Sequence, residues 1–208
     1  MIEALSIPGA WVFTPKQFGD SRGTFLEWFN APAFGDETGH SLRLAQANMS
    51  VSAAGVLRGI HFADVPPGQA KYVTCPHGAI FDVVVDIRVG SPTFGQWDSV
   101  LLDDVDRRAV YLSEGLGHAF LSLEAESVAV YVCSEGYAPQ HEHGVHPLDP
   151  DIGIDWPTTG RDGTPLTYQL SDKDQKAPTL AKAKDLGLLP TLDTVTAYVD
   201  ELRATRMA

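Results

Sequence analysis

Short apolar segments separated by turn residues occupy most of this chain. The segments are rich in Val, Ile, Phe and Tyr, and Gly and Pro punctuate the chain between them. Short strands separated by such turns are typical of an all-β sandwich or barrel. The segments that we predict to be strands are residues 9–15, 23–29, 42–52, 55–62, 70–76, 79–88, 97–102, 108–113, 118–123 and 127–133.

The pattern changes after Cys133. Residues 134–157 are dense in His, Pro, Gly and Asp, which predicts a loop. A helical tail is predicted at residues 191–204, with Thr191 or Asp193 as its N-cap. Since the chain contains no internal repeat and no linker, we expect one domain. Its β-rich part spans residues 1–180, and residues 181–208 form a C-terminal helical extension of the same domain.

Two predicted strands combine an apolar face with a face that carries reactive groups. Side chains alternate across a strand, so residues 79–88 place Phe81 and its odd-numbered neighbours on one face and Asp82 and Asp86 on the other. In residues 127–133, small side chains flank Tyr131 on one face. Each polar face is either a solvated outer surface or the wall of a cavity, and alternation alone does not separate the two.

The segment GVLRGIHF, residues 55–62, carries a guanidinium and an imidazole among apolar residues. A regular strand would place Arg58 and His61 on opposite faces, because their spacing is odd. A β-bulge at Gly59 would bring both to one side. Other ionisable side chains that interrupt strands or turns built for a core are Lys71, Asp82, His118 and Tyr131. Such groups are costly to bury unless they are paired or functional.

Composition and charge restrict the classes of partner. The chain has 208 residues, a net charge of −12 and a pI near 4.8, which argues against nucleic acid or an anionic membrane as its ligand. Its N-terminal residues lack the features of a signal peptide, and no apolar run approaches the ~18 residues of a membrane span. Two cysteines, Cys75 and Cys133, imply no disulfide framework, so we expect a cytoplasmic protein.

Taken together, nine motifs resemble the dTDP-4-dehydrorhamnose 3,5-epimerase family and its antibiotic-sugar relatives. They run from about residue 7 to residue 180 in the family's order: FGDSRGTFLEWF, QANMS, GVLRGIHF, QAKYV, IFDVVVDIRVGSPTFGQW, EGLGHAF, YVCSEGYAP, DIGIDWP and LSDKDQKAPTL. The resemblance implies a cupin-type β-barrel or jelly roll. It also implies a cofactor-independent isomerase of deoxysugar biosynthesis that acts on a dTDP-4-keto-6-deoxyhexose, and a homodimer with exchanged N-terminal strands.

The same motifs imply the catalytic residues. His61 would be the general base and Asp174, the last residue of SDKD, would orient it. Tyr131 would be the acid on the opposite face of the sugar. Lys71 would lie beside the oxygen on carbon 4, with Asp82 in support.

Other residues would hold the substrate by the same resemblance. Arg58 and His118 would line the pocket, and Tyr137 would pack near the base of the nucleotide. A further group from one subunit would help to hold the nucleotide or pyrophosphate bound by another subunit: Arg22, Phe25, Glu27, Gln46 and Asn48.

This set of residue types suits epimerisation beside a ketone. A ketone at carbon 4 acidifies the hydrogens on carbons 3 and 5, so a base can remove one and leave an enolate. Inversion needs a proton returned from the other face, which a Tyr with a pKa of about 10 can supply. His is poised to accept a proton near neutral pH, and an ammonium aimed at the forming oxyanion supplies electrostatic stabilisation.

Two other functions compete with this interpretation. One is a sugar-nucleotide-binding cupin without activity, although binding alone needs neither an acid nor a base. The other is a metal-dependent cupin, although the segment GIHFAD supplies only one barrel histidine. Separately, His141, His143 and His146 could bind zinc or iron, although the Pro and Gly residues around them are typical of a solvated surface loop. Pro147 and Leu148 stand where many 3,5-epimerases have Trp and Asn, and this feature, with the longer tail, resembles antibiotic-pathway epimerases. Some of those enzymes invert carbon 3 alone, so the number of inverted centres stays open.

Overall fold

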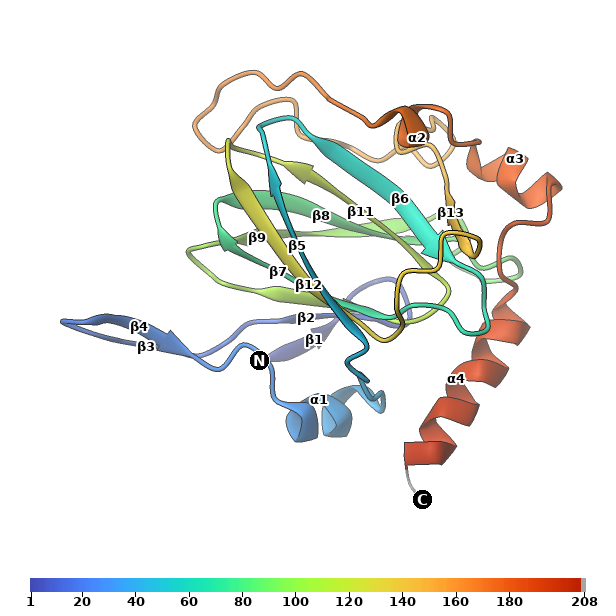
Figure 1. Cartoon of the computed structure of the whole chain (residues 1–208), viewed down its shortest axis with the longest axis horizontal. Coiled ribbons are helices and arrows are strands. Elements are labelled where there is room, and N and C mark those ends of the chain that lie inside the picture. Colours follow the sequence, from blue (N-terminus) through green and yellow to red (C-terminus); the bar gives the residue numbers. More distant parts are fainter. Residues whose placement is uncertain (207–208) are drawn as a thin grey trace.

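Two antiparallel sheets face each other in the computed structural model, which describes residues 1–206 (Figure 1). The first sheet has the order β1 (Ile2–Ala4), β2 (Ala10–Phe13), β10 (Ala109–Leu112), β7 (Lys71–His77), β12 (Ser127–Cys133) and β5 (Gln46–Ser52). The second has the order β13 (Glu142–Gly144), β6 (Leu57–Ala63), β11 (Leu116–Ser122), β8 (Ala79–Asp86) and β9 (Trp97–Asp103). The predicted all-β class is therefore confirmed.

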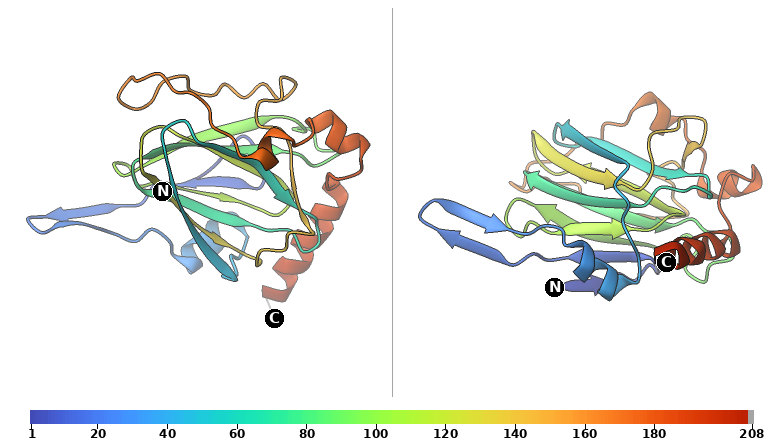
Figure 2. Two further views of the ribbon diagram at one scale, coloured as in Figure 1. Left: turned by 45° about the horizontal axis from the view of Figure 1, so that its top comes forward. Right: turned by 60° about the horizontal axis from the view of Figure 1, so that its bottom comes forward.

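A separate hairpin and four helices complete the described chain. The hairpin of β3 (Gln17–Asp20) and β4 (Gly23–Leu26) projects away from the two sheets in every view (Figures 1 and 2). The helices are α1 (Ala31–Thr38), α2 (Asp172–Gln175), α3 (Leu180–Asp185) and α4 (Leu192–Arg206). The last two lie within residues 180–206.

Every predicted strand segment contains a strand, while strands β1, β3 and β13 and helices α1 and α2 were not predicted. Strands β1 and β13 have only three residues each, and β3 is fully exposed, so none has an alternating apolar pattern. Helix α1 depends on its caps: the Asn30 side chain accepts from the Ala33 amide, and Gly39 ends the helix with a φ of 70°. For α4, Thr191 is the N-cap, because its Oγ1 accepts from the Thr194 amide at 3.1 Å.

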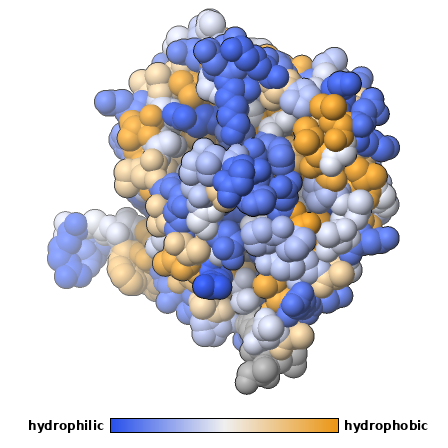
Figure 3. Space-filling model, turned by 45° about the vertical axis from the view of Figure 1, so that its right-hand side comes forward, coloured by the Kyte–Doolittle hydropathy of each residue, from blue (hydrophilic) through white to orange (hydrophobic). Residues whose placement is uncertain are grey.

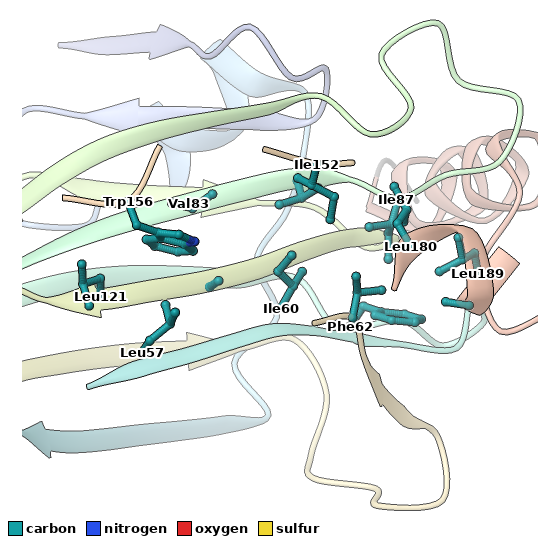
Figure 4. Close-up of a cluster of buried hydrophobic side chains, with 14 of the residues drawn as sticks. Leu57, Ile60, Phe62, Val83, Ile87, Leu121, Ile152, Trp156, Leu180 and Leu189 are labelled. Atoms are coloured by element: carbon teal, nitrogen blue, oxygen red, sulfur yellow. The ribbon is translucent and has the colours of Figure 1, made fainter. Parts of the chain in front are cut away.

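Three apolar clusters hold these layers together. One lies between the two sheets and includes Val73, Ile80, Val84 and Phe120. A second lies on the outer face of the five-stranded sheet, where the chain after Cys133 covers it (Figure 4). Its labelled members are Leu57, Ile60, Phe62, Val83, Ile87, Leu121, Ile152, Trp156, Leu180 and Leu189. A third cluster, under α1, packs aromatic rings of the six-stranded sheet against Phe34.

Both faces of β8 are therefore buried. Val83 and Val85 belong to the outer cluster, whereas Ile80 and Val84 point between the sheets together with Asp82. Of the two interpretations of the polar faces, the structure contradicts the solvated surface for β8, and Asp82 lies inside the barrel.

The second carboxylate of β8, Asp86, serves the fold. It is fully buried and accepts hydrogen bonds from the Arg88 guanidinium at 2.7–2.8 Å and from the Ser91 and Thr93 hydroxyls at 2.6 Å. Burial disfavours its charged form, but these donors outweigh burial and hold the Asp86 pKa below its usual value. Asp86 therefore stabilises the turn after β8.

The β-bulge predicted at Gly59 is present. His61 pairs with His118 and Arg58 pairs with Phe120, so β6 has two residues between these pairs where β11 has only Ala119. Leu57, Ile60 and Phe62 consequently pack on the outer cluster. Arg58 and His61 share the other face, as a bulge requires.

Candidate functional site

The polar end of the space between the sheets holds the ionisable residues singled out in the sequence. His61 and His118 are cross-strand neighbours on the five-stranded sheet. Lys71 and Tyr131 stand on adjacent strands of the facing sheet. A sugar bound between the sheets would therefore meet imidazoles on one side and an ammonium and a phenol on the other.

His61 forms a hydrogen-bonded pair with Asp174 across 113 positions of sequence. The His61 Nε2 lies 2.7 Å from the Asp174 Oδ1, and the carboxylate side chain is only 5% exposed. Ser171 caps α2 by accepting from the Asp174 amide at 3.1 Å, which sets the start of this short helix against β6. Burial raises the Asp174 pKa, but hydrogen bonds from His61 and the Gly59 backbone outweigh it and lower the pKa overall. Asp174 is thus an ionised partner for the imidazole.

His118 forms a second pair with Asp82. The His118 Nε2 lies 2.8 Å from the Asp82 Oδ2, and both side chains are buried. The other carboxylate oxygen, Oδ1, is buried without a hydrogen-bond partner among the described residues. Buried polar atoms are usually paired, so this oxygen marks the interior near Lys71 as a place where a polar group or water would bind.

Burial shifts the pKa values of Lys71 and Tyr131 in opposite directions. Burial lowers the Lys71 pKa because it disfavours the ammonium, while Cys133, Glu142 and Asp82 act to raise it. Burial raises the Tyr131 pKa, and the nearby Glu142 adds to that effect, whereas Arg58 opposes it. Tyr131 therefore keeps its proton at neutral pH.

A cavity of about 250 Å³ opens beside His61 and Asp174. Arg58 and Tyr137 line it, and Tyr137 is 63% exposed at its mouth. The Tyr137 amide donates to the Gln46 Oε1 at 2.7 Å, and Gln46 in turn donates to Asn48 at 2.7 Å. The two amide side chains of β5 thus hold the predicted nucleotide-facing tyrosine at the entrance.

The hairpin residues lie elsewhere. Arg22 is at the turn between β3 and β4, where its side chain is 87% exposed and bonded to Asp20. Phe25 is 70% exposed on β4. The Glu27 carboxylate, just after β4, accepts from the side-chain amide of Asn30. Within one chain, Arg22 and Phe25 therefore stand on the hairpin, which projects from the sheets (Figure 2), and Glu27 follows it directly. None of the three lines the His61 cavity.

Several residues of the cavity were not predicted from the sequence. Glu142 from β13 lines it, as do Gln169 and Ser171 from the segment that leads into α2 and Lys173 of α2 itself. The alternation in QHEHG was the available signal for Glu142: on a strand, two histidines face one way and the glutamate the other. Lys173 directly precedes Asp174, but the sequence spacing does not reveal that α2 packs against β6.

The histidine-rich loop does not gather into a metal site. His141 and His143 are bonded to Asp64 at 3.1 and 2.7 Å, and His146 accepts from the Leu148 amide at 3.1 Å. Among residues 1–206, no three His, Cys, Asp or Glu side chains are arranged to hold a metal ion. The described residues therefore give no support to His141, His143 and His146 as a ligand set.

A larger cavity of about 420 Å³ lies between α4 and the strands β1 and β2, far from this chemistry. Its lining is mostly apolar, and its Arg203 is bonded to His40 and Asp200. The face that carries the C-terminal helices is largely hydrophilic with scattered apolar patches (Figure 3). We assign the functional site to the smaller cavity because the His61–Asp174 pair lines it.

No helix among residues 1–206 is long and apolar enough to cross a membrane.

The family model for dTDP-4-dehydrorhamnose 3,5-epimerase matches residues 4–182. A dTDP-4-dehydrorhamnose 3-epimerase of Streptomyces niveus is 59% identical over 196 residues, 94% of this chain and 91% of that protein. A dTDP-4-dehydrorhamnose 3,5-epimerase of Mycolicibacterium smegmatis is also 59% identical, over 199 residues, 96% of this chain and 95% of its own.

A solved structure matches nearly the whole fold. It is ChmJ, described as a 3′-monoepimerase from Streptomyces bikiniensis in complex with dTDP-quinovose. The two folds superpose with a TM-score of 0.91 at 50% identity, over 97% of this chain and 99% of that one.

Proposed function

We propose that this chain, which belongs to the dTDP-4-dehydrorhamnose 3,5-epimerase family, epimerises a dTDP-4-keto-6-deoxyhexose by removing a proton beside the 4-keto group. One observation carries the proposal: His61, hydrogen-bonded to Asp174 of α2, stands on the five-stranded sheet, while Tyr131 and Lys71 stand on the facing six-stranded sheet. A base and an acid on opposite walls are what inversion at carbon requires, since the proton leaves one face and returns to the other.

In the proposed reaction His61 is the base. Its Nε2 is engaged by Asp174, so Nδ1 is the nitrogen that takes the proton from the sugar carbon. The ionised Asp174 then stabilises the imidazolium and keeps the ring in one orientation. The electron pair of the broken C–H bond moves into the enolate, whose negative charge collects on the oxygen at carbon 4.

Lys71 and Tyr131 complete the cycle. The Lys71 ammonium stabilises the enolate oxygen, in surroundings buried enough to make that interaction strong. Tyr131 returns a proton to the carbon from the other face, and its raised pKa makes it a phenol rather than a phenolate beforehand. His61 and Tyr131 then exchange their protons with water. The steps need no metal or redox cofactor, because the substrate's own ketone acidifies the C–H bond.

We place the pyrophosphate at Arg58 and at Arg22 of a second subunit. A chain of net charge −12 must hold an anion with a few local cations, and Arg offers bidentate contacts to phosphate. The proposal of a homodimer with exchanged N-terminal strands is supported by the projecting β3–β4 hairpin, which exposes Phe18 and Phe25. Edge strand β5 also exposes Met49 and Val51, and an uncovered apolar edge is an aggregation hazard.

The experiment that tests the activity also counts the inverted centres. Relatives named as 3-epimerase and as 3,5-epimerase are equally identical to this chain, so identity does not decide between them. The purified protein is incubated with dTDP-4-keto-6-deoxyglucose in D₂O, and deuterium at carbons 3 and 5 is followed by NMR. Enzyme-dependent deuterium at carbon 3 is expected. No deuterium at either carbon above the enzyme-free rate would refute the proposal.

A further inference from the structure

The cavity beside α4 is elongated. Its volume of about 420 Å³ lies within the range of about 300–1,000 Å³ that is typical of small-molecule sites. Its lining positions on α4 recur every three or four residues from Leu192 to Arg203, so they share one face of the helix. The Leu192 amide donates to the Val89 carbonyl at 2.9 Å, and Arg203 donates to the His40 Nε2 at 3.0 Å. These two ends are roughly 16 Å apart along the helix, so the cavity favours a long, narrow ligand.

Apolar side chains make up most of the cavity wall. Leu5, Ile7 and Trp11 line it from the N-terminal strands and their connection, and Val195 and Val199 line it from α4. Cavities with such a lining do not hold ordered water well and accept apolar molecules instead. The body of a ligand in this cavity should therefore be apolar.

Two buried side chains in the wall have polar atoms without a partner. Arg88 is 6% exposed and Ser113 is 2% exposed, and both line the cavity. Arg88 uses its Nε and Nη2 for Asp86 and for the Pro8 carbonyl. Among residues 1–206, no hydrogen bond engages the Arg88 Nη1 or the Ser113 Oγ. Because buried polar atoms are usually paired, these two donors mark the place where the polar group of a ligand would bind.

The two donors converge above Gly9, which also lines the cavity. A Cβ on Gly9 would lie 2.6 Å from the Ser113 Oγ and 3.7 Å from the Arg88 Nη1. An oxygen atom near that point would be at the distance of an O–H···O hydrogen bond from Ser113. A second oxygen of the same group could accept from the Nη1 of Arg88. A carboxylate has two such oxygens, and its hydrogen bonds with a guanidinium are stronger than those of a neutral acceptor.

The charges around the cavity favour a group with a single negative charge. Arg88 is paired with Asp86, and Arg203 at the other end is paired with Asp200 at 3.5 Å. The cavity therefore offers N–H and O–H donors without a large excess of positive charge, which suits a carboxylate better than a doubly charged phosphate.

We propose that the cavity beside α4 binds a linear, medium-chain monocarboxylate. The carboxylate accepts hydrogen bonds from the Arg88 Nη1 and the Ser113 Oγ, and the apolar chain lies along Val195 and Val199 of α4. This site is separate from the His61 cavity, and the two share no lining residue. The inference therefore goes beyond the proposed epimerisation and does not depend on it.

The test is direct binding of decanoate to the purified full chain, measured by isothermal titration calorimetry at neutral pH. Decan-1-ol is the neutral ligand of equal chain length, and it should bind on the order of ten-fold more weakly, because it lacks the charge that strengthens the hydrogen bonds. Ser113→Ala removes one donor and should weaken decanoate binding by on the order of ten-fold, with a smaller effect on decan-1-ol.

Two further variants locate the binding. Val199→Trp adds a large side chain to the cavity wall, so both ligands should lose their binding. Val105→Trp adds the same side chain at an exposed position outside the cavity, and its affinities should match those of the wild type. Circular dichroism and thermal melting show whether each variant folds. If Val199→Trp does not fold, the comparison of decanoate with decan-1-ol in Ser113→Ala decides.

Three results would overturn the inference. The first is no heat of binding with decanoate up to about 1 mM, which is the affinity of a very weak site. The second is unchanged decanoate binding in a folded Val199→Trp variant, because the ligand would then lie elsewhere. The third is unchanged decanoate binding in Ser113→Ala together with equal affinities for the two ligands, because the carboxylate would then not be recognised. None of these results bears on epimerisation, which is measured separately.

Discussion

Gly59→Ala probes the bulge that brings Arg58 and His61 to one face. Gly59 has a φ of 120°, and a Cβ there would lie 2.5 Å from the Ala119 Cβ and 2.6 Å from the His118 carbonyl oxygen. The backbone conformation costs an L-residue about 1–2 kcal/mol. Overpacking against the backbone of β11 adds about 1–3 kcal/mol. We therefore expect Gly59→Ala to lower the free energy of unfolding by about 2–5 kcal/mol, a large part of the ~5–15 kcal/mol typical of domains.

The assay combines stability with activity, and Gly90→Ala is the matched control. Gly90 also has a positive φ, 90°, but a Cβ there would have no atom within 4 Å, so only the backbone cost of about 1–2 kcal/mol applies. At about 2–4 °C per kcal/mol, thermal melting should separate the two variants. Gly59→Ala should also lose epimerisation, because the Gly59 backbone donates to Asp174. Equal losses of stability in the two variants would refute the packing argument.

Three further experiments test the roles of single side chains. Tyr131→Phe should keep deuterium exchange into the starting epimer while inverted product falls by on the order of 10²-fold, and unchanged product would remove Tyr131 from the mechanism. Asp174→Asn should reduce turnover. Because the folded-state pKa of Asp174 is lowered, its ionisation stabilises the fold above about pH 4 and is lost on further acidification. Urea denaturation should therefore show a weaker acid dependence in Asp174→Asn, and an identical dependence contradicts the pairing. Co-expressed Arg22→Ala and His61→Ala chains should recover activity as mixed dimers, and mixed dimers no more active than either parent would refute the shared site.

For binding an anion at the site, the placement of a few local charges is more important than the net negative charge of the chain. Arg58 and Lys173 line the His61 cavity, where the proposed ligand carries a pyrophosphate. Asp174 and Glu142 stand in the same cavity, but each has a cationic or imidazole neighbour. Local pairing of this kind lets a protein with a net charge of −12 offer an anion a favourable binding position.

The strands and the candidate site residues that the structure brings together could be predicted from the sequence, because strands follow a local pattern and the candidate residues stand in recognisable motifs. Period-two alternation identified the strand segments, and the odd spacing of Arg58 and His61 predicted the bulge at Gly59 that the register of β6 and β11 confirms. The elements that were not predicted are those stabilised mainly by contacts with other elements of the fold. Strand β13 is three residues long and is defined by pairing with β6, and helix α1 covers aromatic rings from distant strands.

Tertiary structure alone decided which face of each strand is inside and which distant groups meet. Alternation places Asp82 and Asp86 on the same side of β8. Only packing pairs Asp82 with His118 and Asp86 with Arg88. The loop histidines suggested a metal site in the sequence, but the fold brings Asp64 to them and turns Glu142 inward. Side-chain direction follows local backbone period, whereas burial and charge pairing depend on segments that only long-range packing brings together.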